Sequence, residues 1–148
     1  MPPAKSGMKV GWVFIYHNTR RRDGDIKNVM AKYFKKEEFA CKCGCGRAAI
    51  SSRLLLRLDK ARELFGGAIH INSGYRCENH NKAIGGKQDS AHLAGGAADL
   101  SCVNSRDRYH LLCALLASGF NRVGITPTFF HVDIDESKSP NVIWLYKE

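Results

Sequence analysis

The sequence lacks a hydrophobic run long enough to cross a membrane. Its longest early apolar stretch, residues 10–16, is far shorter than the roughly 20 residues that a transmembrane helix needs, and a run of arginines follows it closely. A secretory signal has the opposite order, with positive charge before the apolar stretch and small residues after it. We therefore expect no membrane span and no export signal, and we expect the protein to be made in the cytoplasm.

Internal repeats and low-complexity segments are also absent, and a hydrophobic content of 44% excludes a disordered chain. Acidic side chains are few, with 14 Asp and Glu against 23 Lys and Arg, so the net charge is +9. This charge suits a polyanionic surface, whether nucleic acid, anionic lipid or a bacterial wall. Basic and aromatic residues do not form the interleaved stripe that follows a nucleic-acid strand, so we expect no nucleic-acid partner.

The chain contains six cysteines, although nothing in it indicates secretion and hence a disulfide framework. Cys41, Cys43 and Cys45 alternate with single residues, a tighter spacing than the about two to four residues that usually separate the ligands of a structural zinc. Two interpretations stay open. One is a metal site or a redox-labile pair, with Cys77 as a further member, and the other is a cysteine-rich turn with free thiols. A nucleic-acid-binding zinc protein built on these cysteines would need a fourth ligand at a suitable spacing.

Hydrophobic periodicity predicts two helices and several short strands. Apolar residues recur at helical spacing over 50–65 and again over 105–118, with Asn104 or Ser105 as the cap of the second helix. Glycines follow both runs and end them. The predicted strands are residues 68–72, 97–102, 122–125, 129–134 and 142–146.

These elements predict a single α+β domain over residues 30–148, with a mainly antiparallel sheet and flanking helices. Residues 1–29 show no periodic pattern that continues into this domain. They are predicted to be an N-terminal extension that the domain does not need, and residues 10–16 are a candidate short strand.

The glycine-rich stretch between residues 73 and 96 is where function is expected, because loops held by a scaffold carry sites. His92 lies in this stretch, Asp99 on the predicted strand that follows, and His131 on a later strand. Two histidines and an aspartate form a hydrolytic zinc set, with three protein ligands and one open position for water. Taken singly, each of these residues is more often structural, as a hydrogen-bonded histidine or an aspartate paired with an arginine.

Three sequence strings, taken together, resemble one family. They are Ser-Gly-Tyr-Arg at 73–76, the pattern Ser-x-His-x-x-Gly-x-Ala-x-Asp at 90–99, and Phe-His-Val-Asp at 130–133. The chain resembles the zinc D-alanyl-D-alanine carboxypeptidases and their phage endolysin relatives, which share a fold with the signalling domain of hedgehog. The resemblance runs from about residue 33 to residue 146.

The resemblance implies roles for individual residues. His92, Asp99 and His131 would bind one Zn²⁺ per chain. Arg76 would act in catalysis and substrate binding, because its permanently charged fork suits both a carboxylate and a developing oxyanion. Ser90 would hydrogen-bond the peptide near the metal, and Gln88 is a second candidate donor to the substrate.

The general base is where the sequence departs from the family. Many relatives carry Asp or Glu three residues before the last zinc histidine, but this chain has Thr128 there, and threonine cannot take a proton from water at neutral pH. Asp133 is the nearest acidic alternative, on the same strand face as His131. It is predicted as a catalytic residue, with a partner of the zinc histidine and a purely structural group as the alternatives that stay open.

The resemblance predicts a zinc peptidase that hydrolyses the stem peptide or the cross-links of bacterial peptidoglycan. We expect a monomeric phage or prophage endolysin that acts on the cell wall after its release from the cytoplasm. The alternative is a non-catalytic, zinc-stabilised binding module of the same fold. Thr128 favours that alternative, whereas Arg76 and Ser90, which folding alone does not require, speak against it.

Overall fold

The computed structural model describes residues 31–147, so the predicted extension at residues 1–29 and the candidate strand at residues 10–16 lie outside the described residues. Within the described range, no helix is both long enough and apolar enough to cross a bilayer. The elements, in chain order, are η2 (Lys36–Phe39), α1 (Ser52–Phe65), β1 (His70–Ser73), α2 (Glu78–Ala83), β2 (Ala97–Ser101), α3 (Ser105–Ala117), β3 (Arg122–Ile125), β4 (Phe129–Asp133) and β5 (Val142–Leu145).

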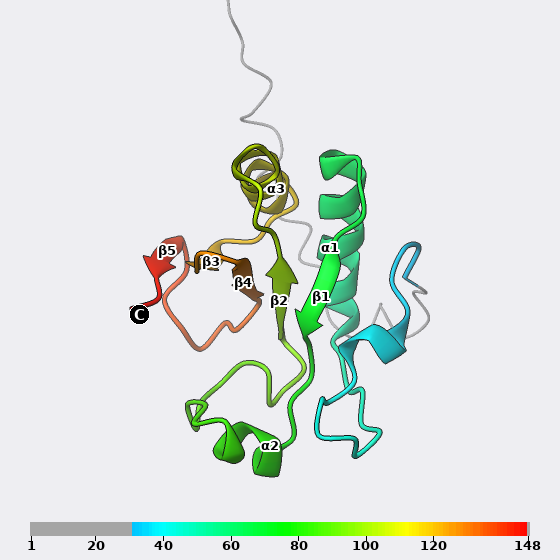
Figure 1. Cartoon of the computed structure of the whole chain (residues 1–148), viewed down its shortest axis with the longest axis vertical. Coiled ribbons are helices and arrows are strands. Elements are labelled where there is room, and N and C mark those ends of the chain that lie inside the picture. Colours follow the sequence, from blue (N-terminus) through cyan, green and yellow to red (C-terminus); the bar gives the residue numbers. More distant parts are fainter. Residues whose placement is uncertain (1–30, 148) are drawn as a thin grey trace, which may run out of the picture.

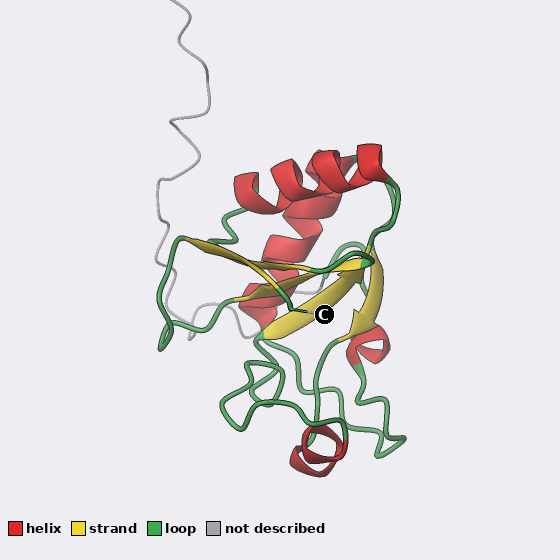
Figure 2. Ribbon diagram, turned by 60° about the vertical axis from the view of Figure 1, so that its left-hand side comes forward, coloured by secondary structure: helices red, strands yellow, loops and turns green. Residues whose placement is uncertain are grey.

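The strands form one sheet in the order β1-β2-β4-β3-β5. The first three pairings are antiparallel, and the last, between β3 and β5, is parallel. The helices α1 and α3 lie on one side of the sheet, while α2 and its flanking loops lie at the opposite end of the molecule (Figures 1 and 2). The predicted small α+β domain with a largely antiparallel sheet is confirmed.

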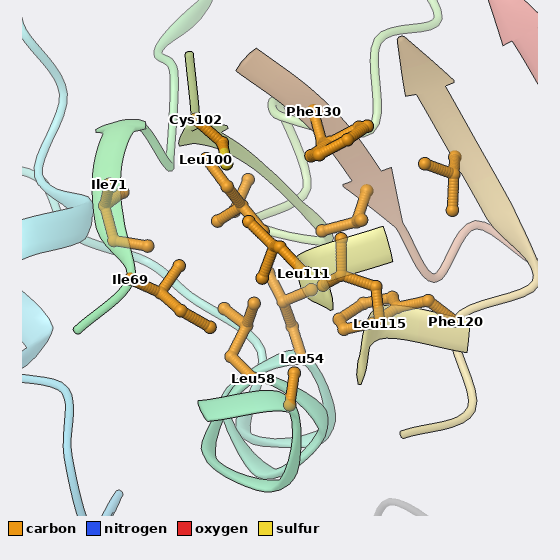
Figure 3. Packing of buried hydrophobic residues seen from close by; sticks show 14 of the residues in the cluster. Leu54, Leu58, Ile69, Ile71, Leu100, Cys102, Leu111, Leu115, Phe120 and Phe130 are labelled. Atoms are coloured by element: carbon orange, nitrogen blue, oxygen red, sulfur yellow. The ribbon is translucent and has the colours of Figure 1, made fainter. Parts of the chain in front are cut away.

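The hydrophobic core fills the space between the two long helices and one face of the sheet. Leu54 and Leu58 of α1 meet Leu111 and Leu115 of α3 in this layer (Figure 3). The strands contribute alternate residues to it, including Leu100 of β2. Because successive side chains of a strand point to opposite faces, the residues between these core positions face away from the helices. That second face carries the site.

Two elements are not among the helices and strands that hydrophobic periodicity predicts. The helix α2 has six residues, mostly polar, so it gives no apolar periodicity, and it begins where the Cys77 sulfur accepts a hydrogen bond from the His80 N–H. The other is the 3-10 turn η2. By contrast, α3 begins as predicted, because the Asn104 side chain accepts hydrogen bonds from the N–H groups of Arg106 and Asp107.

Candidate metal centre

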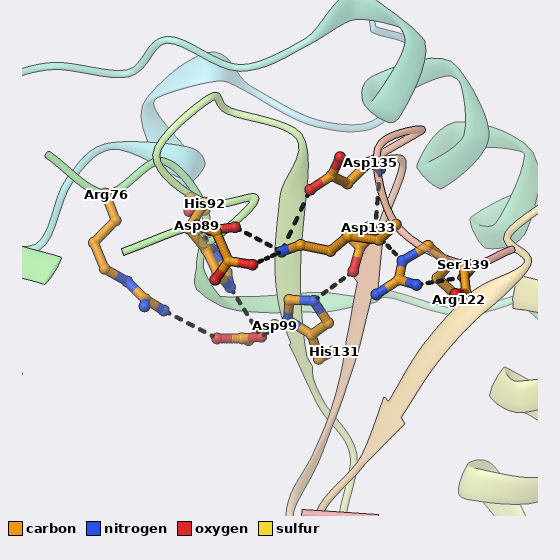
Figure 4. Close-up of polar contacts among 11 residues, drawn as sticks. Arg76, Asp89, His92, Asp99, Arg122, His131, Asp133, Asp135 and Ser139 are labelled. Atoms are coloured by element: carbon orange, nitrogen blue, oxygen red, sulfur yellow. Dashed lines mark hydrogen bonds and ion pairs between the residues drawn. The ribbon is translucent and has the colours of Figure 1, made fainter. Parts of the chain in front are cut away.

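Two neighbouring strands place an aspartate and a histidine side by side. Asp99 of β2 lies directly opposite His131 of β4 in the antiparallel register, with 2.9 Å between Asp99 Oδ1 and His131 Nδ1. His92, in the loop before β2, brings its Nε2 to 3.3 Å from the same oxygen (Figure 4). The three donor atoms lie within 4.8 Å of one another. The structure thus brings together the three residues that were predicted to bind metal.

The donor types and their spacing fit a zinc ion. Zinc binds histidine nitrogen and carboxylate oxygen at about 2.0–2.2 Å in a tetrahedral arrangement, which places neighbouring ligand atoms roughly 3.3 Å apart. The distances of 2.9 and 3.3 Å from Asp99 Oδ1 to the two histidine nitrogens agree with this spacing. Three protein ligands leave one tetrahedral position open, which is the arrangement of a catalytic zinc and not of a structural one.

His92 is held by a backbone carbonyl. Its Nδ1 lies 2.6 Å from the Gly74 carbonyl oxygen, and because a carbonyl only accepts, Nδ1 carries the proton and donates it. The Nε2 atom, which faces Asp99, therefore keeps a free lone pair for a metal ion. The backbone N–H of Arg76 in turn donates to the backbone carbonyl of His92 at 3.1 Å. The segment after β1 is thus bound to the histidine loop from two directions.

Asp133 holds the other edge of the His131 ring. Its Oδ2 accepts a hydrogen bond from His131 Nε2 at 3.0 Å, and its Oδ1 accepts one from Arg122 Nε at 2.7 Å. The Asp135 N–H donates to the same Oδ1 at 3.1 Å. Protein donors thus engage both Asp133 oxygens, and although the residue lines the cavity described below, it is only 2% exposed. This arrangement directs His131 Nδ1 toward Asp99 and His92 (Figure 4).

The surroundings of the two carboxyl groups, Asp99 and Asp133, favour their charged forms. Burial alone would raise the pKa of Asp99, but its close contacts with His131 and His92 outweigh burial and hold that pKa well below its usual range. Asp133 behaves in the same way: burial opposes ionisation, yet hydrogen bonds from His131, Arg122 and the Asp135 N–H lower its pKa. Burial would lower the pKa of His131, whereas its hydrogen bonds to the two carboxylates raise it. Two carboxylates that stay ionised beside a pair of histidines form a site prepared for a cation.

Arg76 reaches the same cluster from the segment after β1. Its Nη2 lies 3.7 Å from Asp99 Oδ2, and its Nη1 donates to Asn81 Oδ1 of α2 at 3.1 Å. The Arg76 Nε is buried and has no hydrogen-bond partner among residues 31–147. The guanidinium is therefore fixed in place by α2 and still has hydrogen-bonding capacity to spare.

These groups line a cavity of about 640 Å³, a size that suits a short peptide. The three metal-site residues and Arg76 occupy part of its lining. Lys138 bridges the rim, because its Nζ donates to the Asp89 carbonyl at 2.6 Å and lies 3.3 Å from Asp135 Oδ2. The remaining lining residues include three aromatic side chains, from Phe129, Trp144 and Tyr146.

The three aromatic side chains of the lining (Phe129, Trp144 and Tyr146) form what we call the aromatic wall. Its packing depends on a glycine in the middle of the sheet. Gly124 of β3 lies between His131 of β4 and Trp144 of β5 in the strand register. A Cβ atom at Gly124 would lie 2.6 Å from the Tyr146 ring and 2.8 Å from the Trp144 ring, closer than such atoms approach in proteins. The missing side chain lets both rings lie beside the His131 imidazole, at centroid distances of 5.6 Å for Trp144 and 6.3 Å for Tyr146.

Of the other residues singled out in the sequence, one lines the cavity and two do not. Ser90 lines the cavity, as a substrate contact requires. Gln88 is exposed and does not belong to the lining, so the geometry gives no support to its predicted contact with substrate. Thr128 is also exposed and outside the lining. The position at which the resemblance implies an acidic residue therefore lies outside the cavity lining described for this chain.

Two contributors to the site went unrecognised in the sequence. Arg122 supplies the buried ion pair to Asp133, and the alternation of polar and apolar residues along 122–125 was the available signal that its side chain faces the site. Asn81 fixes Arg76 through a contact from α2, a helix without apolar periodicity. Nothing in the sequence pattern indicated that role.

The fold and the site together define a small α+β domain in which three potential metal ligands open onto a cavity. The sequence profile of the peptidase M15 family matches residues 32–135, which is most of the chain. The chain belongs to the peptidase M15 family, a zinc-dependent family of peptidases. No curated protein sequence matches the chain.

Proposed function

We propose that the protein is a zinc peptidase that hydrolyses the peptide part of bacterial peptidoglycan, either as a D-alanyl-D-alanine carboxypeptidase or as an endopeptidase of the cross-links. The observation that carries the proposal is the convergence of His92, Asp99 and His131 on one cavity, with the Arg76 guanidinium beside them. Membership of the M15 family supports peptide hydrolysis. The resemblance of the site strings to the D-alanyl-D-alanine carboxypeptidases supports the substrate class.

Each residue of the site has a separate role in the proposed peptide hydrolysis. Zinc held by the two histidines and Asp99 would supply Lewis acidity toward a carbonyl and would lower the pKa of water to about 7. Arg76 would donate hydrogen bonds to the carbonyl oxygen as it gains negative charge, or would bind a terminal carboxylate. Ser90 would hydrogen-bond the substrate backbone. The aromatic wall would exclude water from one side of the peptide.

Asp133 acts, in this proposal, as a positioning residue for His131 and not as the general base. A general base needs access to water or substrate, yet this carboxylate is nearly buried and each oxygen already accepts a hydrogen bond. A carboxylate that accepts the second N–H of a metal-binding histidine fixes the orientation of the ring and raises its basicity. Of the three roles left open by the sequence, the geometry favours this one.

The net charge of +9 supports an anionic wall as the surface on which the enzyme works. A phage or prophage endolysin, monomeric and released to the wall at lysis, accounts for this charge and for the small size of the domain. A cavity of about 640 Å³ suits a substrate made of a few D- and L-amino acids.

Incubation of purified protein with peptidoglycan fragments, with and without a metal chelator, tests the proposal. The expected products, identified by mass spectrometry, have lost a terminal D-Ala or have been separated at a cross-link, and the chelator should abolish their formation. Intact fragments, with zinc still bound to the protein, would overturn the peptidase proposal. That outcome would favour the non-catalytic binding module instead.

The variant Arg76→Lys tests the role of the guanidinium. Lysine keeps the positive charge beside Asp99 but lacks the planar fork. We expect kcat/KM for the cleaved fragment to fall by about 100-fold or more, as for loss of an oxyanion donor, while the zinc content stays that of the wild type. Wild-type kcat/KM in this variant would show that Arg76 does not contact the reacting groups.

A further inference from the structure

A second group of metal-ligating side chains lies away from the cavity. Cys41, Cys43 and Cys45 follow η2, and Cys77 immediately precedes α2. The four sulfur atoms lie within 4.8 Å of one another, although up to 36 residues separate them along the chain. None of the four belongs to the cavity lining described for residues 31–147. The chemistry of the cavity therefore leaves this cluster unexplained.

The spacing of the sulfurs is that of a metal cage. The distances are 3.4 Å between Cys41 and Cys43, 3.7 Å between Cys41 and Cys77, and 3.6 Å between Cys43 and Cys77. Zinc binds thiolates at about 2.3 Å, so the sulfurs of a tetrahedral site lie roughly 3.8 Å apart. A disulfide would instead bring one pair of sulfur atoms to about 2.05 Å, and the other two sulfurs would not share that short distance. Three nearly equal distances match one face of a tetrahedron, and the Cys45 sulfur, within 4.8 Å of the other three, can supply the fourth ligand.

The backbone around the cluster suits thiolate ligands. The Cys77 N–H donates to the Cys41 sulfur at 3.4 Å, and the His80 N–H donates to the Cys77 sulfur at 3.4 Å. Hydrogen bonds of this kind favour the charged form of the acceptor. The Cys41 N–H donates to the Arg47 carbonyl at 2.8 Å and closes the loop.

Two glycines explain how cysteines separated by single residues can converge. Gly44 has a φ of +83° and Gly46 a φ of +74°, a left-handed conformation that glycine adopts readily. These turns fold the backbone tightly between Cys43 and Cys45 and directly after Cys45. The spacing that departs from ordinary structural zinc sites in sequence is therefore compatible with one in space.

We infer that Cys41, Cys43, Cys45 and Cys77 bind a structural zinc ion, distinct from the metal of the cavity. Soft thiolates in a tetrahedral arrangement select zinc among the common divalent cations. Four protein ligands leave no open position, which is the mark of a structural site and not of a catalytic one. The chain then holds two zinc ions, one more than the sequence predicted.

The second zinc would brace the segment that serves the cavity. Cys77 is the neighbour of Arg76, and the Tyr75 N–H donates to the Phe39 carbonyl at 2.8 Å. A metal joining Cys77 to the loop after Phe39 fixes both ends of this short segment. The segment supplies the Gly74 carbonyl to His92 and the guanidinium beside Asp99. The structural zinc therefore supports the geometry of the cavity from outside it.

Metal counting tests the inference without any activity assay. Protein purified under reducing conditions is expected to contain two zinc ions, of which a thiol-reactive mercurial releases one. Cys43→Ser and Cys45→Ser should each lower the content by one, and because both side chains are exposed, neither change disturbs the core. Cys113→Ser, a cysteine of α3 outside the cluster, is the matched control and should keep both ions.

Cobalt gives an independent spectroscopic measurement on the unaltered chain. Protein loaded with Co²⁺ should show the intense thiolate-to-metal charge-transfer absorption of a sulfur site, and Cys45→Ser should weaken it while His92→Ala leaves it in place. The inference is overturned if the cobalt protein lacks this absorption, if Cys43→Ser leaves the zinc content unchanged, or if mass spectrometry shows a disulfide between two of the four cysteines. None of these outcomes depends on peptide cleavage.

Discussion

His92→Ala and His131→Ala should each cost the protein one bound zinc ion and all measurable peptide cleavage. The physical reason is that each change leaves two donor atoms in a site that needs three protein ligands. Zinc analysis of desalted protein, together with the fragment assay, measures both effects. A variant that keeps the metal and the activity would show that the ligands lie elsewhere.

His110→Ala is the matched control for these variants. His110 is exposed on α3, and its ring meets the Tyr109 ring edge to face at a centroid distance of 5.4 Å. Its replacement should leave the zinc content, thermal stability and cleavage unchanged. A similar loss of zinc in this control would indicate that metal is bound by surface histidines and not by the cluster at Asp99.

Asp133→Asn should weaken zinc binding by about 10- to 100-fold, as the loss of a carboxylate behind a metal-binding histidine does. An asparagine amide cannot accept hydrogen bonds at both oxygen positions, so either His131 or Arg122 loses its partner. Competition with a chromogenic chelator measures the zinc affinity. At saturating zinc, turnover should return to within about tenfold of the wild type, which general-base loss would not allow.

The variant Arg122→Gln distinguishes a loss of zinc affinity from a loss of folding stability. It breaks the same buried ion pair, which typically costs about 3–5 kcal/mol of stability, but leaves the Asp133 carboxylate next to His131. We expect it to lower the melting temperature while affecting zinc affinity less than Asp133→Asn. If Asp133→Asn instead keeps full zinc and loses about 100-fold or more in rate at saturating metal, with the acidic limb of the pH profile gone, Asp133 is the general base.

Much of the fold follows from local sequence signals. The apolar spacing of Leu54 and Leu58 and the cap at Asn104 each reflect interactions within one element, so the sequence predicts α1 and α3 well. The strand β3 was predicted with its observed bounds, Arg122–Ile125. The parallel pairing of β3 with β5 was not foreseen, because pairing partners depend on the whole topology. The six-residue α2 is too short and polar to produce a periodic signal.

The sequence could name candidate residues for the site, but it could not predict how they are arranged in space. His92, Asp99 and His131 come from a loop and two strands, so no fixed sequence interval joins them, and family strings had to identify them. The support of His131 by Asp133, and of Asp133 by Arg122, is visible only once β3 and β4 are paired. The convergence of Cys77 with a loop more than 30 residues earlier depends likewise on tertiary structure.

The direct opposition of Asp99 and His131 across β2 and β4 also has a consequence for how the protein folds. A slip of one residue in this pairing would turn one of the two side chains toward the helices. The ligand set therefore exists only after two strands 32 residues apart have closed in the correct alignment. In refolding experiments, metal uptake by this centre should follow the formation of helix, so the ion stabilises the completed sheet and does not guide its assembly.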